Sequence, residues 1–328
     1  MFNLKEIKIL LLSGFIIVIF TSCTSIQYKD ELVRAYYNLG NSYRDLGKFK
    51  DAELVLARAV QIDPSFYSAA YNLGMVQILS GEYKKGIGNL NLLLEKEPGN
   101  TLVLKVLAWG YYKNGDTFQA IAVYKKILNI DTCNPDVLNN ISILLMNQKM
   151  YSEAYPYLVQ REGLGDANED MLYNLGVAER ELNISSGLSW FESAYKKNPR
   201  LEKNIIAYIN ALKPDRDFKR IVSLYDDLIT INPEPSYLFE KAFILLTSIE
   251  DYENGLPVLE SALQKGYSNL DRIEELKEYP DLLDKDKILS IILANPVKTL
   301  SDDQAPPLKD LEESQTEVPV LSVSDIQG

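Results

Sequence analysis

The stretch that decides the fold is Tyr36-Tyr37-Asn38-Leu39-Gly40, which is followed by Gly47 and Ala52. The same pattern returns 34 residues later as Tyr71-Asn72-Leu73-Gly74, and again as Tyr173-Asn174-Leu175-Gly176. A fixed period of this length is typical of an array of stacked helical units, each of which needs its neighbours to bury its apolar face. The sequence therefore predicts a repeat architecture.

Composition excludes several classes of function. The chain has 328 residues, and 46% of them are hydrophobic, which is enough for a continuous core. The net charge of −12 repels phosphate backbones, so nucleic acid is not an expected partner. Histidine is absent, which excludes catalytic triads and metal sites that depend on imidazole. The two cysteines, Cys23 and Cys133, do not form a disulfide framework.

Each unit contains two helical patterns. In residues 33–66 the apolar residues of both patterns recur at helical spacing: Tyr36, Leu39 and Tyr43 in the first, and Ala52, Val55, Leu56 and Ala59 in the second. Gly47 breaks the chain between them, and Pro64 closes the unit because proline disfavours helical geometry in the residue before it. The pattern predicts a helix–turn–helix unit, in which the small residues Gly40 and Ala52 let the two helices approach closely.

These residues resemble the tetratricopeptide-repeat family, whose unit favours Leu-Gly, Tyr, Gly, an aromatic residue, Ala and Pro at set positions. Residues 33–66 match nearly all of these positions. Residues 67–100 match with Gln77 where Tyr is usual, and residues 101–134 match with the closing proline displaced to Pro135, which implies an irregular turn there. The resemblance implies an all-α, right-handed superhelical solenoid.

Four weaker units follow, with the boundaries 135–168, 169–201, 202–235 and 236–269. Lys149 replaces the turn glycine of the first of these, and the second has one residue deleted in its turn. A small residue nevertheless recurs at the twentieth position of nearly every unit: Ala52, Gly86, Ala120, Ala154, Gly187 and Gly255. The resemblance therefore covers residues 33–269 and implies about seven units.

Residues 1–22 read as an export signal. Lys5 and Lys8 precede an apolar run from Ile9 to Phe20, which is too short for a full membrane span. The residues that end at Cys23 resemble the lipobox of bacterial lipoproteins, in which this cysteine becomes the lipidated first residue of the mature protein. The resemblance implies that acyl chains on Cys23 anchor the protein to a membrane. An uncleaved N-terminal anchor helix is the alternative.

Three further segments complete the expected organisation. Residues 23–32 form a tether, and residues 270–295 form a helical cap that covers the last unit, because the ends of repeat arrays need such a cover. Residues 296–328 mix proline with Asp and Glu and are expected to form a disordered acidic tail. A short linear motif for a partner is the alternative to a merely solvated tail.

Motifs for catalysis are absent from the sequence. It has no Gly-rich phosphate loop, no cysteine pair at metal spacing and no nucleophile elbow. Adjacent carboxylates such as Glu274 and Glu275 point about 100° apart on a helix, so they are interpreted as a solvated face. Cys133 has no resolving cysteine nearby and is interpreted as a small apolar filler rather than a redox thiol. We expect no enzyme activity, no cofactor and no metal.

Recognition of a partner is the remaining function. In tetratricopeptide repeats the first helix of each unit lines a concave groove, and the resemblance assigns the following residues to it: Tyr37, Asn41, Tyr71, Asn72, Met75, Lys105, Trp109, Tyr112, Asn139, Ile143 and Tyr173. An apolar and aromatic groove favours an amphipathic helix or an extended peptide as ligand. The alternative is that these side chains pack between adjacent first helices, or that the chain itself closes the groove. The cationic clamp that some members of the family use for C-terminal carboxylates is incomplete, so acidic C-termini are not expected ligands.

We therefore expect a scaffold for protein–protein interaction in the cell envelope, with a protein or peptide partner in the groove. The lipid anchor would hold it on a bacterial membrane, at the periplasmic face or the outer membrane. A periplasmic ligand-binding or transporter-accessory protein and a surface adhesin are the alternatives. A converging pair of carboxylates in a cleft would instead indicate an enzyme.

Overall fold

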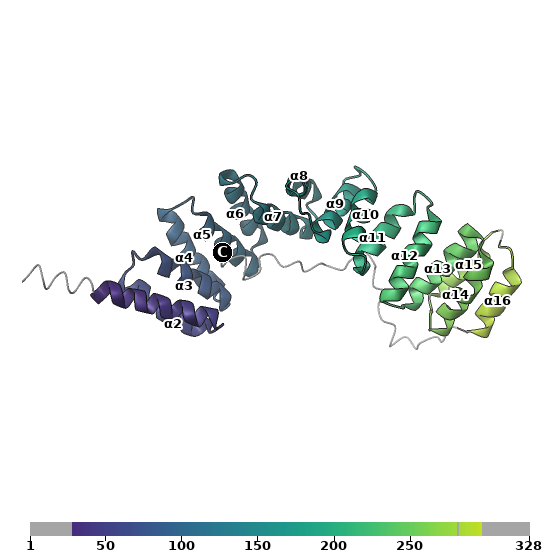
Figure 1. Cartoon of the computed structure of the whole chain (residues 1–328), viewed down its shortest axis with the longest axis horizontal. Coiled ribbons are helices and arrows are strands. Elements are labelled where there is room, and N and C mark those ends of the chain that lie inside the picture. The colour runs from purple at the N-terminus through teal and green to yellow at the C-terminus, as the bar shows by residue number, and fades with distance from the viewer. Residues whose placement is uncertain (1–27, 281, 297–328) are drawn as a thin grey trace, which may run out of the picture. The chain divides into compact units, whose positions relative to one another are not determined.

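The computed structural model describes residues 28–280 and 282–296, and every regular element in them is helical (Figure 1). Residues 28–45 form the first helix. The helices that follow are α2 Phe49–Ile62, α3 Tyr67–Leu79, α4 Tyr83–Lys96, α5 Thr101–Lys113, α6 Thr117–Ile130, α7 Pro135–Asn147, α8 Tyr151–Glu162, α9 Glu169–Glu181, α10 Leu188–Lys197, α11 Glu202–Leu212, α12 Phe218–Ile231, α13 Pro235–Ile244, the π-helix η1 Leu245–Ile249, α14 Tyr252–Gln264, α15 Leu270–Glu278 and α16 Lys285–Ala294.

This order of paired helices confirms the all-α repeat array that the period predicts. One boundary differs, because residues 28–32, which we assigned to the tether, already belong to the first helix. The export signal with Cys23 and the acidic tail from residue 297 onward lie outside the described residues.

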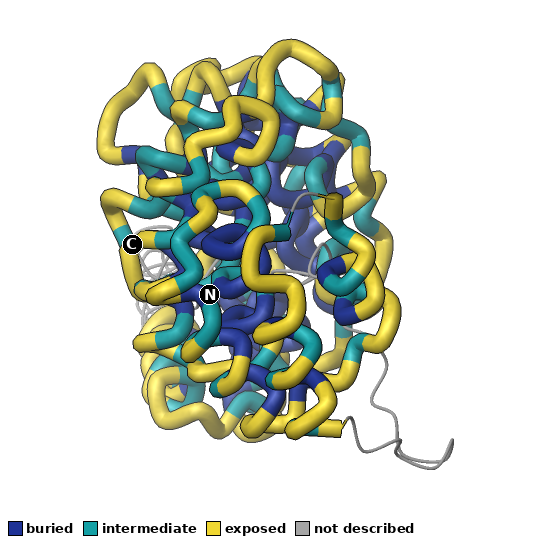
Figure 2. The backbone as a smooth tube through the Cα atoms, turned by 90° about the vertical axis from the view of Figure 1, so that its right-hand side faces the viewer, coloured by how far each residue is buried: buried dark blue, intermediate teal, exposed yellow. Residues whose placement is uncertain are grey.

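The described chain divides into two compact units, which we treat separately: unit 1 is residues 28–144 and unit 2 is residues 145–296. In unit 1 consecutive helices from α2 to α6 pack on one another, and the first helices of the second and third repeats also meet, since α3 contacts α5. In unit 2 consecutive helices from α8 to α13 pack in the same order, and α14 contacts α13 and α16. Along the helices, buried stripes alternate with exposed ones (Figure 2).

Glycine at the eighth position of a repeat lets its two helices approach closely. A Cβ built on Gly40 would lie 2.5 Å from Cγ of Leu56, and one built on Gly74 would lie 2.8 Å from Cγ of Leu90. Carbon atoms prefer about 3.5–4.0 Å, so neither position tolerates a side chain without movement. Leu56 and Leu90 are fully buried. The Leu-Gly signature in the sequence is thus a packing requirement.

The fifteenth residue of every repeat, in the turn between its two helices, has a positive φ. These residues are Gly47, Gly81 and Gly115 in the first three repeats, and Lys149, Asn183, Arg216 and Glu250 in the next four. In the non-glycine set φ lies between 55° and 60°, a left-handed conformation that costs an L-residue about 1–2 kcal/mol. A Cβ built on any of the three glycines would meet nothing within 4 Å. The turn therefore selects glycine for its conformation and not for space.

The turn between α6 and α7 is held by side-chain hydrogen bonds. The carboxylate of Asp131 accepts from the backbone N–H of Cys133 at 3.3 Å and from Nδ2 of Asn134 at 2.9 Å. Asn134 in turn accepts from the N–H of Val137 at 3.2 Å, and Pro135 is the first residue of α7, a position that suits proline. Cys133 is exposed, so its interpretation as an apolar filler is wrong.

Helices α15 and α16 cover the last repeat. Ile273 and Leu276 of α15 and Ile288 of α16 are buried in one cluster with Phe239 of α13. The ring of Tyr267, in the connection between α14 and α15, stacks on Phe239 with centroids 4.0 Å apart. This end of the array therefore buries the apolar face that a terminal repeat would otherwise expose.

Candidate functional site

The candidate site is the face formed in unit 1 by the first helix of each repeat, which we call the first-helix face. A row of partly exposed residues lies at the fifth position of each repeat, where Tyr37, Tyr71, Lys105 and Asn139 follow one another at intervals of 34 residues. All four side chains are half-buried. We call these four residues the fifth-position row. Tyr173 continues the same spacing in unit 2 and is also half-buried.

Most residues at the ninth position lie deeper. Met75, Trp109 and Ile143 are only 3%, 7% and 3% exposed. Asn72 is 5% exposed, whereas Asn41 remains half-buried. The sequence left two interpretations of these side chains open, a partner-binding groove or packing between adjacent first helices. The burial of Asn72, Met75, Trp109 and Ile143 fits packing between helices. The fifth-position row, Asn41 and Tyr112 are the residues of the predicted set in unit 1 that are half-buried and not buried.

The N-terminal end of this face is held by one ring contact and one amide bridge. The rings of Tyr37 and Phe66 meet edge to face, with centroids 5.2 Å apart and planes at 73°. Nδ2 of Asn72 donates to Oδ1 of Asn41 at 2.6 Å, which ties α3 to the helix of residues 28–45. These contacts keep the exposed edges of Tyr37 and Asn41 in fixed positions.

The middle of the face presents phenols and one ammonium group. Burial raises the pKa of Tyr71, although the positive charge of Arg44 opposes this shift, so the phenol is a neutral hydrogen-bonding group at neutral pH. Nζ of Lys105 lies 3.5 Å from Oδ2 of Asp136. Because Asp136 is 58% exposed, this ion pair is weak. Tyr112 is half-buried on the same helix as Lys105.

A polar bridge joins α2, α3 and α4 inside unit 1. Gln77 is 6% exposed. Its Nε2 donates to Oε1 of Glu53 at 3.0 Å, and its Oε1 accepts from Nδ2 of Asn89 at 2.7 Å. From the sequence we noted only that Gln77 stands where tyrosine is usual. That departure was the available signal, because a buried amide needs polar partners.

In unit 2 the first helices are joined by charged or polar pairs about one repeat apart in sequence. These pairs are Lys203 with Asp170, Tyr237 with Glu202, and Arg272 with Glu240. Each pair links consecutive first helices, namely α9 with α11, α11 with α13, and α13 with α15. The sequence did not lead us to expect these bridges, and a spacing of 32 to 35 residues between the partners is their only sequence signal.

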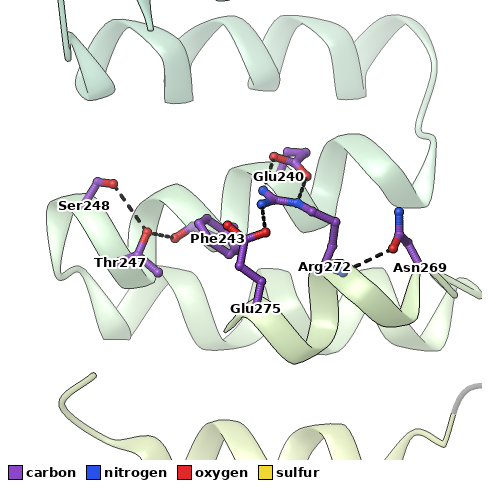
Figure 3. A network of polar contacts seen from close by, with 7 residues as sticks. All are labelled: Glu240, Phe243, Thr247, Ser248, Asn269, Arg272 and Glu275. Carbon is purple, nitrogen blue, oxygen red and sulfur yellow. Dashed lines mark hydrogen bonds and ion pairs between the residues drawn. The ribbon is translucent and has the colours of Figure 1, made fainter. Parts of the chain in front are cut away.

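The bridge at Arg272 is the most extensive of the three (Figure 3). Its Nε and Nη2 donate to the two carboxylate oxygens of Glu240 at 3.0 and 2.8 Å, and its Nη1 donates to Glu275. The guanidinium carbon lies 4.2 Å from the ring centroid of Phe243. Burial by itself would lower the pKa of Arg272, but the hydrogen bonds and charges of Glu240 and Glu275 raise it. Arg272 therefore joins α13 to α15 as a permanent cation.

Tyr173 is engaged by two neighbours in unit 2. Its ring meets that of Phe191 edge to face, with centroids 5.7 Å apart. Nζ of Lys203 lies 5.1 Å from the Tyr173 centroid, which is within cation–π range. Burial raises the pKa of Tyr173, and the charge of Arg180 opposes the shift.

Residues 28–280 and 282–296 contain neither a candidate metal site nor a candidate membrane-spanning helix. This part of the chain brings together no three His, Cys, Asp or Glu side chains in a way that could hold a metal ion. None of its helices has the length and apolar character that crossing a membrane requires. Glu274 and Glu275 pair with different cations, Lys277 and Arg272, so they do not converge.

Comparisons with known proteins agree with this architecture. The family model described as tetratricopeptide repeat matches residues 33–66. A protein described as an uncharacterized lipoprotein, from Treponema pallidum, is 26% identical over 144 residues, which are 44% of this chain and 73% of that protein. Protein O-mannosyl-transferase Tmtc3 of Drosophila melanogaster is 26% identical over 145 residues, which are 44% of this chain but only 16% of that protein.

One solved structure shows the same fold over most of the chain. It is a tetratricopeptide repeat protein from Parabacteroides merdae, which superposes with a TM-score of 0.51 at 18% sequence identity. The match covers 75% of this chain and 97% of that one. The likeness concerns the arrangement of helices and carries no information on a ligand.

Proposed function

We propose that this chain, whose first repeat matches the tetratricopeptide-repeat model and whose helices are arranged as in a solved tetratricopeptide repeat protein, is a scaffold for protein–protein interaction. It captures one partner on the first-helix face while a lipid on Cys23 holds it at a membrane. The ligand is a peptide or an amphipathic helix of a partner protein. It lies along the fifth-position row of unit 1.

The observation that carries this proposal is the exposure pattern of the first helices. The fifth position stays half-buried in four consecutive repeats of unit 1, whereas the ninth position is buried at Met75, Trp109 and Ile143. A row of partly exposed tyrosine, lysine and asparagine side chains on a rigid support offers apolar rings and hydrogen-bonding groups together. Aromatic anchors on such surfaces commonly contribute the largest share of binding energy.

The contrast between the units favours unit 1 as the ligand site. The first helices of unit 2 use their charged side chains on one another, as in Arg272 with Glu240. A ligand that bound there would have to break these bridges. Breaking a partly buried pair is costly, because it leaves a charged group without its partner. In the fifth-position row of unit 1, Lys105 pairs only weakly with the largely exposed Asp136.

The membrane anchor is supported by the sequence around Cys23 and by one relative. The positive start, the short apolar run and the lipobox-like residues precede Cys23, and the similar protein from Treponema pallidum is described as a lipoprotein. Exported and acylated at Cys23, the protein would work on the periplasmic face or the outer membrane of a bacterial envelope.

The partner site is tested by affinity capture from native membranes with the full chain, followed by mass spectrometry. Tyr71→Ala should weaken capture about 30-fold, equivalent to roughly 2 kcal/mol for an aromatic anchor. Tyr157→Ala is the matched control, because Tyr157 is a half-buried tyrosine on α8 in unit 2. Equal capture by the two variants would contradict the assignment of the site.

The anchor is tested separately with Cys23→Ala. The wild-type chain should incorporate labelled fatty acid and partition into detergent, whereas Cys23→Ala should incorporate none. A variant that still carries label would show that Cys23 is not the acylated residue.

A further inference from the structure

The second helices of unit 1 carry a charge opposite to that of the whole chain. Their exposed residues on α2, α4 and α6 include six cations, Lys50, Arg58, Lys84, Lys85, Lys96 and Lys126, and two anions, Asp51 and Glu95. The chain as a whole carries −12. We call the exposed residues of these three helices the outer face of unit 1.

The same helices of unit 2 do not share this property. The exposed residues of α8, α10, α12 and α14 include three cations, Lys196, Lys197 and Lys219, and four anions, Glu153, Asp226, Glu253 and Glu260. The repeats are alike in fold, so the excess of cations is not a consequence of the architecture. It is specific to the outer face of unit 1.

Large apolar side chains stand among these cations. Leu54, Leu92 and Phe118 are 73%, 57% and 64% exposed. Leu54 lies one helical turn from both Lys50 and Arg58, so it belongs to the same exposed stripe. Exposed leucine and phenylalanine interleaved with lysine and arginine are typical of helices that lie in the interface of an anionic membrane.

The chain also brings this unit close to a membrane. Residues 28–45 are already helical, and Cys23 precedes residue 28 by five residues. An extended chain spans at most about 3.3–3.6 Å per residue, so unit 1 begins within about 18 Å of an acylated Cys23. The anchor would thus tether the outer face to the membrane, and cations that contact the surface feel the field of anionic lipids, which decays over about 8 Å at physiological salt.

We propose that the outer face of unit 1 lies on the surface of an anionic phospholipid membrane. This proposal rests on the lipid anchor proposed above. The cations contact lipid phosphates, and Leu54, Leu92 and Phe118 enter the boundary between headgroups and acyl chains. The first-helix face belongs to the other helices of the same repeats, so it remains available to a partner protein.

The test uses the full acylated chain reconstituted on vesicles of phosphatidylcholine, with or without phosphatidylglycerol. A water-soluble acetylating reagent modifies accessible lysines, and peptide mass spectrometry gives the rate at each site. Lys84 and Lys96 should react about tenfold more slowly on the anionic vesicles, which corresponds to about 1.4 kcal/mol. Lys196 and Lys219 of unit 2 should react equally on both, and high salt should reduce the protection of Lys84 and Lys96.

Paired charge reversals make the test specific. Lys84→Glu with Lys85→Glu should abolish the protection of Lys96. Lys196→Glu with Lys197→Glu, an adjacent exposed pair on α10, should leave that protection unchanged. Lys85 and Lys196 each form one exposed ion pair with a nearby glutamate, so the two double variants lose comparable contacts.

The outcomes separate this proposal from the anchor. A chain that stays on both kinds of vesicle but shows equal acetylation rates at Lys84 overturns the outer-face proposal alone. A chain that leaves both kinds of vesicle overturns the anchor and the outer-face proposal together. Protection that follows the density of protein on the vesicle, and not its phosphatidylglycerol content, would indicate contact between copies of the chain and would also overturn it.

Discussion

Two alanine substitutions at glycine should change the stability of unit 1 in opposite directions. Gly81 lies in the turn between α3 and α4 with φ +88°, whereas Gly88 lies inside α4. A Cβ built on either residue meets nothing within 4 Å. The two variants therefore differ only in the backbone conformation that alanine must adopt, and their chemical compositions are identical.

The magnitudes follow from that conformation. At Gly81 the left-handed geometry costs alanine about 1–2 kcal/mol, and the smaller entropy of the unfolded chain returns about 0.4–1 kcal/mol. Gly81→Ala should thus lower the free energy of unfolding by about 1 kcal/mol. Gly88→Ala should raise it by about 0.8–1 kcal/mol, because alanine is the better helix former.

Thermal melts followed by circular dichroism measure the difference. For a chain of this size about 1 kcal/mol corresponds to about 2–4 °C, so the two melting temperatures should lie about 4–8 °C apart. Glu250→Gly, at the equivalent turn of the last repeat, should stabilise by about 0.5–1 kcal/mol, since Glu250 now holds φ 60°. If Gly81→Ala melts at or above Gly88→Ala, the left-handed turn is not what selects glycine.

Further predictions concern the core, the polar bridges and the weaker repeats. Trp109→Ala should lower the free energy of unfolding by about 3–5 kcal/mol in a urea titration, and a loss below about 1 kcal/mol would indicate that this side chain contributes to the exposed surface instead. Arg272→Lys keeps the charge but not the two-pronged geometry, so it should cost about 1–2 kcal/mol in the same assay; an unchanged midpoint would contradict the bridge. Burial alone would raise the pKa of Glu179, but hydrogen bonds from neighbouring side chains lower it overall. The ionised Glu179 therefore stabilises the fold above its unfolded pKa, and this contribution is lost as the pH falls through its folded pKa. Glu179→Gln should remove this part of the pH dependence, which urea titrations at neutral and acid pH would measure. Amide hydrogens should exchange faster in residues 135–201, whose turns depart from the repeat pattern, than in residues 33–100, and uniform protection across the array would refute this.

The period of the sequence was sufficient to predict the fold. Residues at fixed positions of a repeat have fixed roles, so Gly40 could be assigned to a close helix contact from its place in the pattern alone. The turn at Lys149 was located in the same way, although its glycine is missing. The spacing that places a residue on one side of a helix is local, and local spacing can be read from one sequence.

The candidate site could be predicted only as a set of positions. Tyr71 and Trp109 both occupy first-helix positions that the family resemblance assigns to a groove, yet Tyr71 is half-buried and Trp109 is 7% exposed. The depth of each side chain depends on how closely the next repeat approaches. That approach involves contacts between residues 31 or 32 positions apart, as for Asn72 and Arg272 with their partners.

The sequence by itself therefore determined the repeat architecture, the placement of its turns and the anchor hypothesis at Cys23. Only the tertiary structure decided which first-helix residues remain partly exposed, that Gln77 joins three helices, and that the first helices of unit 2 pair their charged side chains with one another. The physical reason is that helical periodicity specifies the direction of a side chain but not the distance to its neighbour. Burial and pairing are properties of that distance.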